Sequence, residues 1–258
     1  MSRLFSFLKF FGVDLLVFKT NLVGLFFYFR DLRLLKKQKG SDNSFVFGKK
    51  YPVLFERFTE SGNMKGHYFH QDLYVAKRIF NASPKKHLDV GSRIDGFVAH
   101  LAVFRSIEVL DIRPLTSSVK NISFQKIDLM TLPENMIDYC DSISSLHAIE
   151  HFGLGRYGDP IDYFGHIKAL ENLTKMLQSG GDLYFSVPIG KQRIEFNAHR
   201  VFSVQYLLDL FNGRYTLKRF SYVDDEGDFY EDVVLTSAAV ADNFGCSWGC
   251  GIFELQKI

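Results

Sequence analysis

Short apolar segments alternate with amphipathic ones from about residue 68 onward, and this alternation restricts the fold more than any other feature of the sequence. The first apolar run, "HLDVG", stops at a glycine, as a buried strand does. Strand–helix–strand repeats of this length form a doubly wound, mostly parallel sheet with helices on both faces, so we predict an α/β fold. Strands are expected at 87–91, 107–112, 122–129, 141–146, 180–188, 215–223 and 250–258, and helices at 68–81, 96–104, 162–178 and 203–211.

Residues 1–40 form a separate hydrophobic segment that we expect to be helical. Its first part, residues 4–29, is rich in phenylalanine and leucine, but charged residues interrupt it and the longest uncharged stretch is residues 20–29. A membrane-spanning helix needs about 18 apolar residues or more, so none is predicted here. The small polar residues 40–44 mark a boundary, and we assign residues 41–258 to one main domain.

A cluster of basic residues follows this apolar stretch and leaves two interpretations open. One is that the segment packs on the protein's own core or on a partner. The other is a helix that lies in the plane of a membrane, with its basic residues near anionic headgroups, which would give the protein a peripheral membrane contact through residues 1–40. The basic residues are Arg30, Arg33, Lys36, Lys37 and Lys39.

Charge and cysteine content exclude other classes of protein. The formal net charge is only +2, so the sequence lacks the excess of basic residues that binds nucleic-acid phosphates, and we expect no nucleic-acid partner. The three cysteines, Cys140, Cys246 and Cys250, argue against a disulfide framework and favour a reducing, cytoplasmic compartment. Because Cys246 and Cys250 have no second pair to complete a four-ligand zinc site, we predict free cysteines and no bound metal.

Acidic residues stand at the ends of successive predicted strands. Asp89 precedes a turn at Gly91, Asp111 ends the second strand, and Asp128 follows the third. Ligands of such sheets bind beyond the carboxyl ends of the strands. A glycine turn lets the backbone approach a ligand, one carboxylate can accept from ribose hydroxyls, and another can accept from an adenine amine. The set predicts an adenosine-type site, although Arg93 breaks the dinucleotide-binding glycine pattern.

Residues 146–160, "LHAIEHFGLGRYGDP", contain His147, Glu150 and His151 in the H-x-x-E-H spacing of inverted zinc proteases. A zinc hydrolase would need both histidines on one face of a stable helix. The predicted strand ends directly before His147 and a glycine follows soon after, so there is little room for such a helix. The alternative is that these residues line a cofactor pocket at the end of the fourth strand.

The motifs "HLDVGSRIDGF", "VLDIRPL", "KIDLM", "SISSLHAIEHFGLGRYGDP", "SGGDLYFSVPIG" and "FNAHRVF" fall in the order of a class I AdoMet-dependent methyltransferase. More closely, residues 65–258 resemble a methyltransferase-like family of unknown function, found in bacterial surface-polysaccharide gene clusters and in nematodes. The motifs "EHFGLGRYGD" and "FNAHR" are specific to that family. The resemblance implies a Rossmann-like sheet of seven strands and a transferase that uses S-adenosyl-L-methionine (AdoMet) on a small-molecule or glycan hydroxyl.

The resemblance also implies roles for individual residues around the cofactor. The methionine part would face the first strand's turn, the ribose hydroxyls would bind the acid after the second strand, and the adenine would lie beside the acid after the third. The fourth strand's end would line the cofactor beside the reactive sulfonium. The implied cofactor-binding residues are Asp89, Gly91, Ser92, Asp111, Asp128 and Leu146, with His147 beside Leu146.

A hydroxyl acceptor must also lose a proton, and histidine is the usual base near neutral pH. The candidate bases are His147, His151 and His199, and each has the alternative of a structural histidine that ties two loops together. Arginines near the pocket could clamp a phosphate or carboxylate of the acceptor, or pair with Asp159 or Glu195 instead. The candidate substrate-binding residues are Glu150, Arg156, Asn197 and Arg200. A non-catalytic scaffold that kept the fold is a further alternative.

Overall fold

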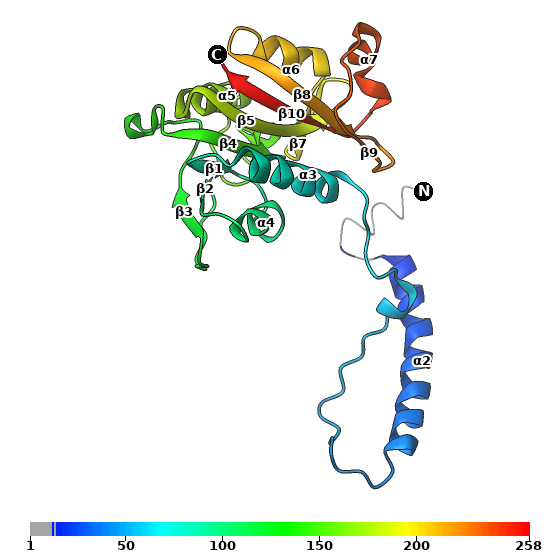
Figure 1. Ribbon diagram of the computed structural model, residues 1–258. Coiled ribbons are helices and arrows are strands. Elements are labelled where there is room, and N and C mark those ends of the chain that lie inside the picture. Colours follow the sequence, from blue (N-terminus) through cyan, green and yellow to red (C-terminus); the bar gives the residue numbers. More distant parts are fainter. Residues whose placement is uncertain (1–11, 13) are drawn as a thin grey trace. The chain divides into compact units, whose positions relative to one another are not determined.

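The computed structural model describes residues 12 and 14–258 (Figure 1). The chain divides into two compact units, Met1–Asn63 and Met64–Ile258. This boundary lies later than the predicted one at residue 40, because residues 41–63 fold back on the preceding helix. The ring of Phe58 packs against that of Phe27, and Arg57 pairs with an aspartate of the same helix.

The N-terminal unit contains the helix α2 (Leu15–Lys39) and a short 3₁₀ turn, η1 (Glu56–Phe58). The Asp14 carboxylate caps α2 by accepting from the Leu16 amide at 2.9 Å. The predicted helical character of the segment is confirmed over α2, while residues 1–11 and 13 lie outside the described residues. In the part of the chain that the structure describes, no helix combines the length and the apolar character needed to cross a membrane.

The main unit is built on one eight-stranded sheet in the order β3-β2-β1-β4-β5-β10-β8-β9 (Figure 1). The first five strands pair in parallel, and β10 is inserted antiparallel between β5 and β8. All seven predicted strands are present, and the two-residue β9 adds an eighth at the edge. The strands are β1 (His87–Val90), β2 (Ile107–Asp111), β3 (Ile122–Lys126), β4 (Cys140–Leu146), β5 (Leu177–Ile189), β8 (Tyr215–Val223), β9 (Phe229–Tyr230) and β10 (Gly249–Lys257). The predicted α/β class with a mostly parallel, Rossmann-like sheet is confirmed.

Several predicted boundaries differ from the observed ones. The predicted helix 162–178 is shorter, because β5 already begins at Leu177, where it pairs with Cys140 of β4. The predicted helix 96–104 is a π-helical turn that continues into one turn of α-helix. A separate hairpin, β6 (Arg193–Glu195) with β7 (His199–Val201), was not predicted. The remaining elements are α3 (His67–Ala82), η2 (Ile94–Val98), α4 (Ala99–Ala102), η3 (Glu134–Met136), η4 (Ile149–His151), α5 (Gly165–Met176), α6 (Val204–Phe211), α7 (Ser237–Ala241) and η5 (Asn243–Gly245).

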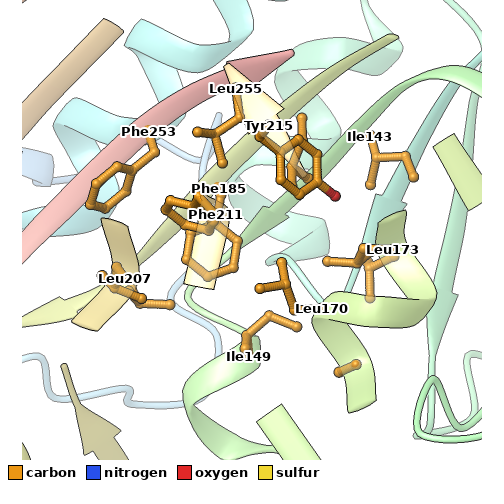
Figure 2. Packing of buried hydrophobic residues seen from close by; sticks show 14 of the residues in the cluster. Ile143, Ile149, Leu170, Leu173, Phe185, Leu207, Phe211, Tyr215, Phe253 and Leu255 are labelled. Carbon is orange, nitrogen blue, oxygen red and sulfur yellow. The ribbon is translucent and has the colours of Figure 1, made fainter. Parts of the chain in front are cut away.

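The sheet has a hydrophobic core on each face, as the alternation along its strands requires. In β5, Phe185 belongs to the larger core and its neighbour Tyr184 to the smaller one. Helices α5 and α6 cover the larger core, where the rings of Phe211 and Phe253 lie 5.4 Å apart (Figure 2). Helix α3 and the η2–α4 segment cover the smaller core. Burial on both faces explains the nearly continuous apolar character of these strands.

The direction of β10 matters for the site. Parallel strands β1 to β5 all end at one edge of the sheet, where their connecting turns gather. Because β10 runs the other way, its first residues lie at this same edge, and Cys250 pairs with Pro188 near the end of β5. The carboxyl edge of the sheet therefore receives residues from both the middle and the end of the sequence.

Candidate cofactor and acceptor site

Two adjoining pockets lie beyond the carboxyl ends of the strands. The inner pocket holds about 550 Å³ of open space and is lined by residues that follow β1, β2, β3 and β4. The outer pocket holds about 960 Å³ and is lined by Tyr68, Arg93, Arg156 and Trp248, among others. The residues shared by the two pockets form the wall between them: Gly91, Arg113, His147, His151 and Tyr157.

Gly91 forms the turn after β1, and its backbone lines both pockets. Its φ of +72° lies in the left-handed region, which disfavours a side chain. A Cβ at this position would also lie 2.9 Å from the Cβ of Ala148. Both the conformation and the packing of this turn therefore require glycine at position 91.

Asp89 lies beneath this turn and is fully buried. Its carboxylate accepts from the Ser92 amide at 3.0 Å, the Ser92 hydroxyl at 2.6 Å and the Ser144 hydroxyl at 2.6 Å. The Ser92 hydroxyl in turn accepts from the Leu146 amide at 3.1 Å. Asp89 and Ser92 line neither pocket. They join the ends of β1 and β4, so the geometry assigns them the support of the turn rather than direct contact with a ligand.

A buried histidine completes this network. His87 Nε2 lies 3.1 Å from the Ser144 oxygen, and its Nδ1 lies 2.8 Å from the Ser142 oxygen. Burial lowers the pKa of His87 to about 3, so the ring is neutral. The Ser144 hydroxyl uses its proton to donate to Asp89, so it accepts from the Nε2–H of His87. The Nδ1 of His87 then has no proton and accepts from the Ser142 hydroxyl. Burial raises the pKa of Asp89 to about 6, although the serine hydroxyls oppose this shift.

Asp111 ends β2 at the inner pocket, as predicted, but its carboxylate is engaged. Arg113 donates through Nε to one carboxylate oxygen at 3.0 Å and through Nη2 to the other at 2.6 Å. The guanidinium also lies over the ring of Tyr157, 4.4 Å from its centroid. A diol that binds Asp111 must therefore replace Arg113 or share the carboxylate with it.

Asp128 lies in the turn after β3 and also lines the inner pocket. One carboxylate oxygen accepts from the Met130 amide at 2.9 Å. This bond fixes the turn and leaves the other oxygen as an acceptor toward the pocket. Leu129 follows and supplies an apolar wall. The three predicted positions after β1, β2 and β3 thus meet around one cavity.

His147 and His151 do not lie on one helix. His147 has a φ of +51°, and only the single 3₁₀ turn η4 follows. Glu150 lies between the two rings: its Oε1 is 2.8 Å from His147 Nδ1 and 3.7 Å from His151 Nε2. The H-x-x-E-H zinc motif is therefore not formed, because its two histidines would have to share one helical face.

The protonation states of these three groups are coupled. Burial favours neutral Glu150, but the adjacent His147 outweighs it and lowers the pKa of the carboxyl. Burial likewise opposes charge on His147, but Cys250 and Glu150 raise its pKa well above the ordinary value. For His151, burial prevails and lowers the pKa below 6.5. His151 is therefore neutral at pH 7, as a general base must be.

A backbone carbonyl orients His151. Its Nδ1 lies 2.6 Å from the Ala198 oxygen, which can only accept, so Nδ1 carries the proton. The lone pair of Nε2 is then available on the side of Glu150. Arg156 Nη1 also donates to the Ala198 oxygen, at 2.9 Å. Among the candidate histidines, His151 has the arrangement that a base at the wall between the pockets requires.

His199 has a different environment. Its Nε2 lies 3.1 Å from the indole nitrogen of Trp248 and 3.2 Å from a Glu195 carboxylate oxygen. These neighbours occupy the nitrogen that a base would use, so His199 ties β7 to the Trp248 loop. Asn197 is exposed in the β6–β7 turn and lines neither pocket.

The two candidate arginines have separate roles. Arg156 is exposed at the outer pocket, where it can reach an acceptor. Arg200 is buried and lines neither pocket. Its guanidinium donates to the carbonyls of Phe152 at 2.6 Å and Tyr163 at 3.1 Å, and more weakly to two others. Arg200 therefore braces the loop that carries the pocket residues.

The resemblance implied that residues 68–72 cover the methionine end of the cofactor, and Tyr68 lines the outer pocket. Sequence reasoning gave no role to three other residues of the site: Arg113, Tyr157 and Trp248. Arg113 follows Asp111 by two residues, and Tyr157 belongs to the glycine-rich loop, so both lay inside motifs that had been recognised. Trp248 is the single tryptophan of the chain and stands just before β10. Only the antiparallel insertion of β10 brings it to this edge.

Comparison with known proteins agrees with this fold. DUF268, a family of Caenorhabditis proteins of unknown function, matches residues 104–240, just over half of the chain. No curated protein matches the sequence. Among solved structures, the N-methyltransferase NodS from Bradyrhizobium japonicum WM9, in complex with S-adenosylhomocysteine, is 15% identical with a TM-score of 0.50, covering 87% of this chain and 97% of NodS.

The [4+2]-cyclase SpnF is 13% identical with a TM-score of 0.52, covering 92% of this chain and 96% of SpnF. At these identities the similarity shows a shared fold and leaves the reaction open. The fold is that of class I AdoMet-dependent methyltransferases.

Proposed function

The chain belongs to the Caenorhabditis DUF268 family, and we propose that it is an AdoMet-dependent methyltransferase whose acceptor is a hydroxyl of a sugar or glycan precursor. One observation carries this proposal. A pocket with a bare glycine turn and two strand-end carboxylates adjoins a second, polar pocket, and a neutral histidine stands in the wall between them.

The residues of the inner pocket fit the cofactor. The Gly91 turn leaves backbone exposed where the methionine part would lie. Once Arg113 moves aside or shares the carboxylate, Asp111 can accept from the ribose hydroxyls, and Asp128 offers one oxygen to the adenine amine. When bound, the cofactor supplies a methyl group that its sulfonium already activates, so the protein mainly positions the acceptor and excludes water.

His151 acts as the base in this proposal. Its Nε2 accepts the proton that the acceptor hydroxyl loses as the new oxygen–carbon bond forms. The Ala198 carbonyl holds the ring through Nδ1–H, and the Glu150 carboxylate, 3.7 Å from Nε2, stabilises the resulting imidazolium. Arg156 and the faces of Tyr68 and Trp248 surround the acceptor in the outer pocket.

Titration calorimetry of the purified protein with AdoMet and with S-adenosylhomocysteine tests the function. We expect both to bind at one site with micromolar affinity. Absence of binding at high micromolar concentration would favour a non-catalytic scaffold.

Replacement of His151 by alanine is expected to lower methyl transfer about 10²–10⁴-fold while S-adenosylhomocysteine binding is unchanged. Because the base works in its neutral form and its pKa is lowered, the wild-type rate should hold down to about pH 6.5 and fall below it. The variant should lack this acidic limb. Transfer of tritiated methyl groups to nucleotide sugars and polysaccharide fractions measures the rate, with exposed His100→Ala as the control. An unchanged rate in His151→Ala would remove the assignment.

We also propose a cytoplasmic location with peripheral membrane contact through residues 1–40. Helix α2 supports this, because Phe18 and Phe26 are more than half exposed and its last turn carries Lys36, Lys37 and Lys39. Sedimentation with anionic vesicles tests the contact. Binding should be lost when the three lysines are replaced by glutamate, and equal binding to neutral vesicles would contradict it.

A further inference from the structure

We propose that His67, His147 and Cys250 bind a Zn²⁺ ion at the wall of the outer pocket. One ligand atom from each residue lies within 4.8 Å of the other two. All three residues are buried, with exposed fractions of 9%, 8% and 0%. The spacing in sequence has no metal motif, so the cluster exists only in the folded chain.

The topology of the sheet explains how the three residues meet. His67 begins α3, which covers the face that carries the smaller core. His147 follows β4 directly, and Cys250 is the second residue of β10. Because β10 is antiparallel to β5, its start and the end of β4 share one edge, and Cys250 points into the same face as α3.

His147 is already oriented as a metal ligand would be. Its Nδ1 lies 2.8 Å from the Glu150 carboxylate, the outer-shell contact that metal-bound histidines commonly make. Its other nitrogen, Nε2, is buried, and its polar neighbour is the Cys250 sulfur, which together with Glu150 raises the pKa of His147. An ion placed between this nitrogen and the sulfur would replace their weak contact, and His147 would release its Nε2 proton on binding it.

The other two ligands must change their present contacts. The ring of His67 is stacked on that of His147, with an angle of 6° between them, and one of its nitrogens contacts the backbone of Trp248. To bind the ion, His67 turns about its χ2 bond and exchanges the Trp248 contact for the metal. The Cys250 sulfur lies 3.6 Å from the Gln71 side-chain oxygen, and it releases its proton when it ligates.

The ligand set selects the metal. Two imidazoles and one thiolate suit the borderline-soft Zn²⁺ and exclude Mg²⁺ and Ca²⁺, which prefer oxygen. Three protein ligands are the number of a catalytic zinc, which keeps a fourth position open. His67 and His147 both line the outer pocket, so an ion held by them would lie at its wall. Metal binding itself does not depend on the proposed methyl transfer.

Competition between the full-length protein and a chromophoric chelator for Zn²⁺ alone tests the site. We expect one tightly bound ion per chain. Loss of an outer-shell partner costs about 10–100-fold in metal affinity, so Glu150→Gln should fall in that range and Cys250→Ser should exceed it. Cys140→Ser is the matched control, since Cys140 is equally buried but lies at the opposite end of the strands, and it should bind as the wild type does.

Cobalt substitution gives a second readout that a folding defect cannot imitate. Co²⁺ bound to the wild type should show a thiolate-to-metal charge-transfer band that is absent in Cys250→Ser. Each variant's fold is checked by circular dichroism and by S-adenosylhomocysteine binding. Zinc affinity that is equal in Cys250→Ser and wild type, or absence of the cobalt band from the wild type, would overturn the site while leaving the cofactor assignment intact.

Discussion

Replacement of Asp111 by alanine is expected to weaken S-adenosylhomocysteine binding by about 100-fold or more. In the proposed complex both carboxylate oxygens accept from ribose hydroxyls. A hydrogen bond to a charged group contributes about 1.5–3 kcal/mol, so the loss of two costs at least about 3 kcal/mol. Each 1.4 kcal/mol is about tenfold in affinity, and calorimetry measures the difference directly.

The control for this prediction is Asp95→Ala. Asp95 pairs with Arg93 two residues away, as Asp111 pairs with Arg113, but its side chain is 79% exposed and it lines neither pocket. Its replacement should leave the affinity unchanged. If Asp111→Ala also bound as the wild type does, the carboxylate would belong to Arg113 alone and the ribose assignment would be wrong.

Replacement of Arg200 by alanine is expected to lower the free energy of unfolding by about 3 kcal/mol or more. The buried guanidinium donates its two shortest bonds to the carbonyls of Phe152 and Tyr163. Without it, these acceptors stay buried and unpaired, at about 1–3 kcal/mol each, and the space of the side chain is left empty. Urea denaturation followed by circular dichroism measures the change.

Arg156→Ala is the matched control because Arg156 belongs to the same loop but is exposed and makes one short bond, to Ala198. Its effect on stability should stay within about 0.5 kcal/mol. If Arg200→Ala were as stable as the wild type, the structural role would be wrong, and the role that the sequence suggested, a clamp for the acceptor, would be favoured instead.

The sequence predicted the position of some residues of the candidate site but not the contacts that they make. Gly91, Asp111 and Asp128 could be placed at one pocket because each directly follows a parallel strand, and all such ends meet at one edge. For these three residues, their position at the end of a strand was enough to predict that they lie at the pocket. The engagement of Asp111 by Arg113 was not predictable, because it depends on side-chain conformations in the folded turn.

The histidines show the limit of reasoning from spacing. In sequence, His147 and His151 matched a helical metal motif. In the structure a left-handed residue at 147 breaks the helix, and each ring contacts a different side of Glu150. The spacing of residues specifies neighbours only when the backbone conformation between them is known.

The sequence by itself determined the architecture of the main unit and the edge of the sheet at which the candidate site lies. Apolar periodicity and acidic residues at strand ends are local properties, and they can be read without knowing which residues touch. The tertiary structure decided which residues act together. Cys250 reaches His67 and His147 only because β10 enters the sheet antiparallel, next to β5. Arg200 became a brace and Arg156 a surface group because one is enclosed by the loop and the other lies outside it. Such contacts join distant parts of the chain, and packing of the whole core, rather than any single segment, fixes them.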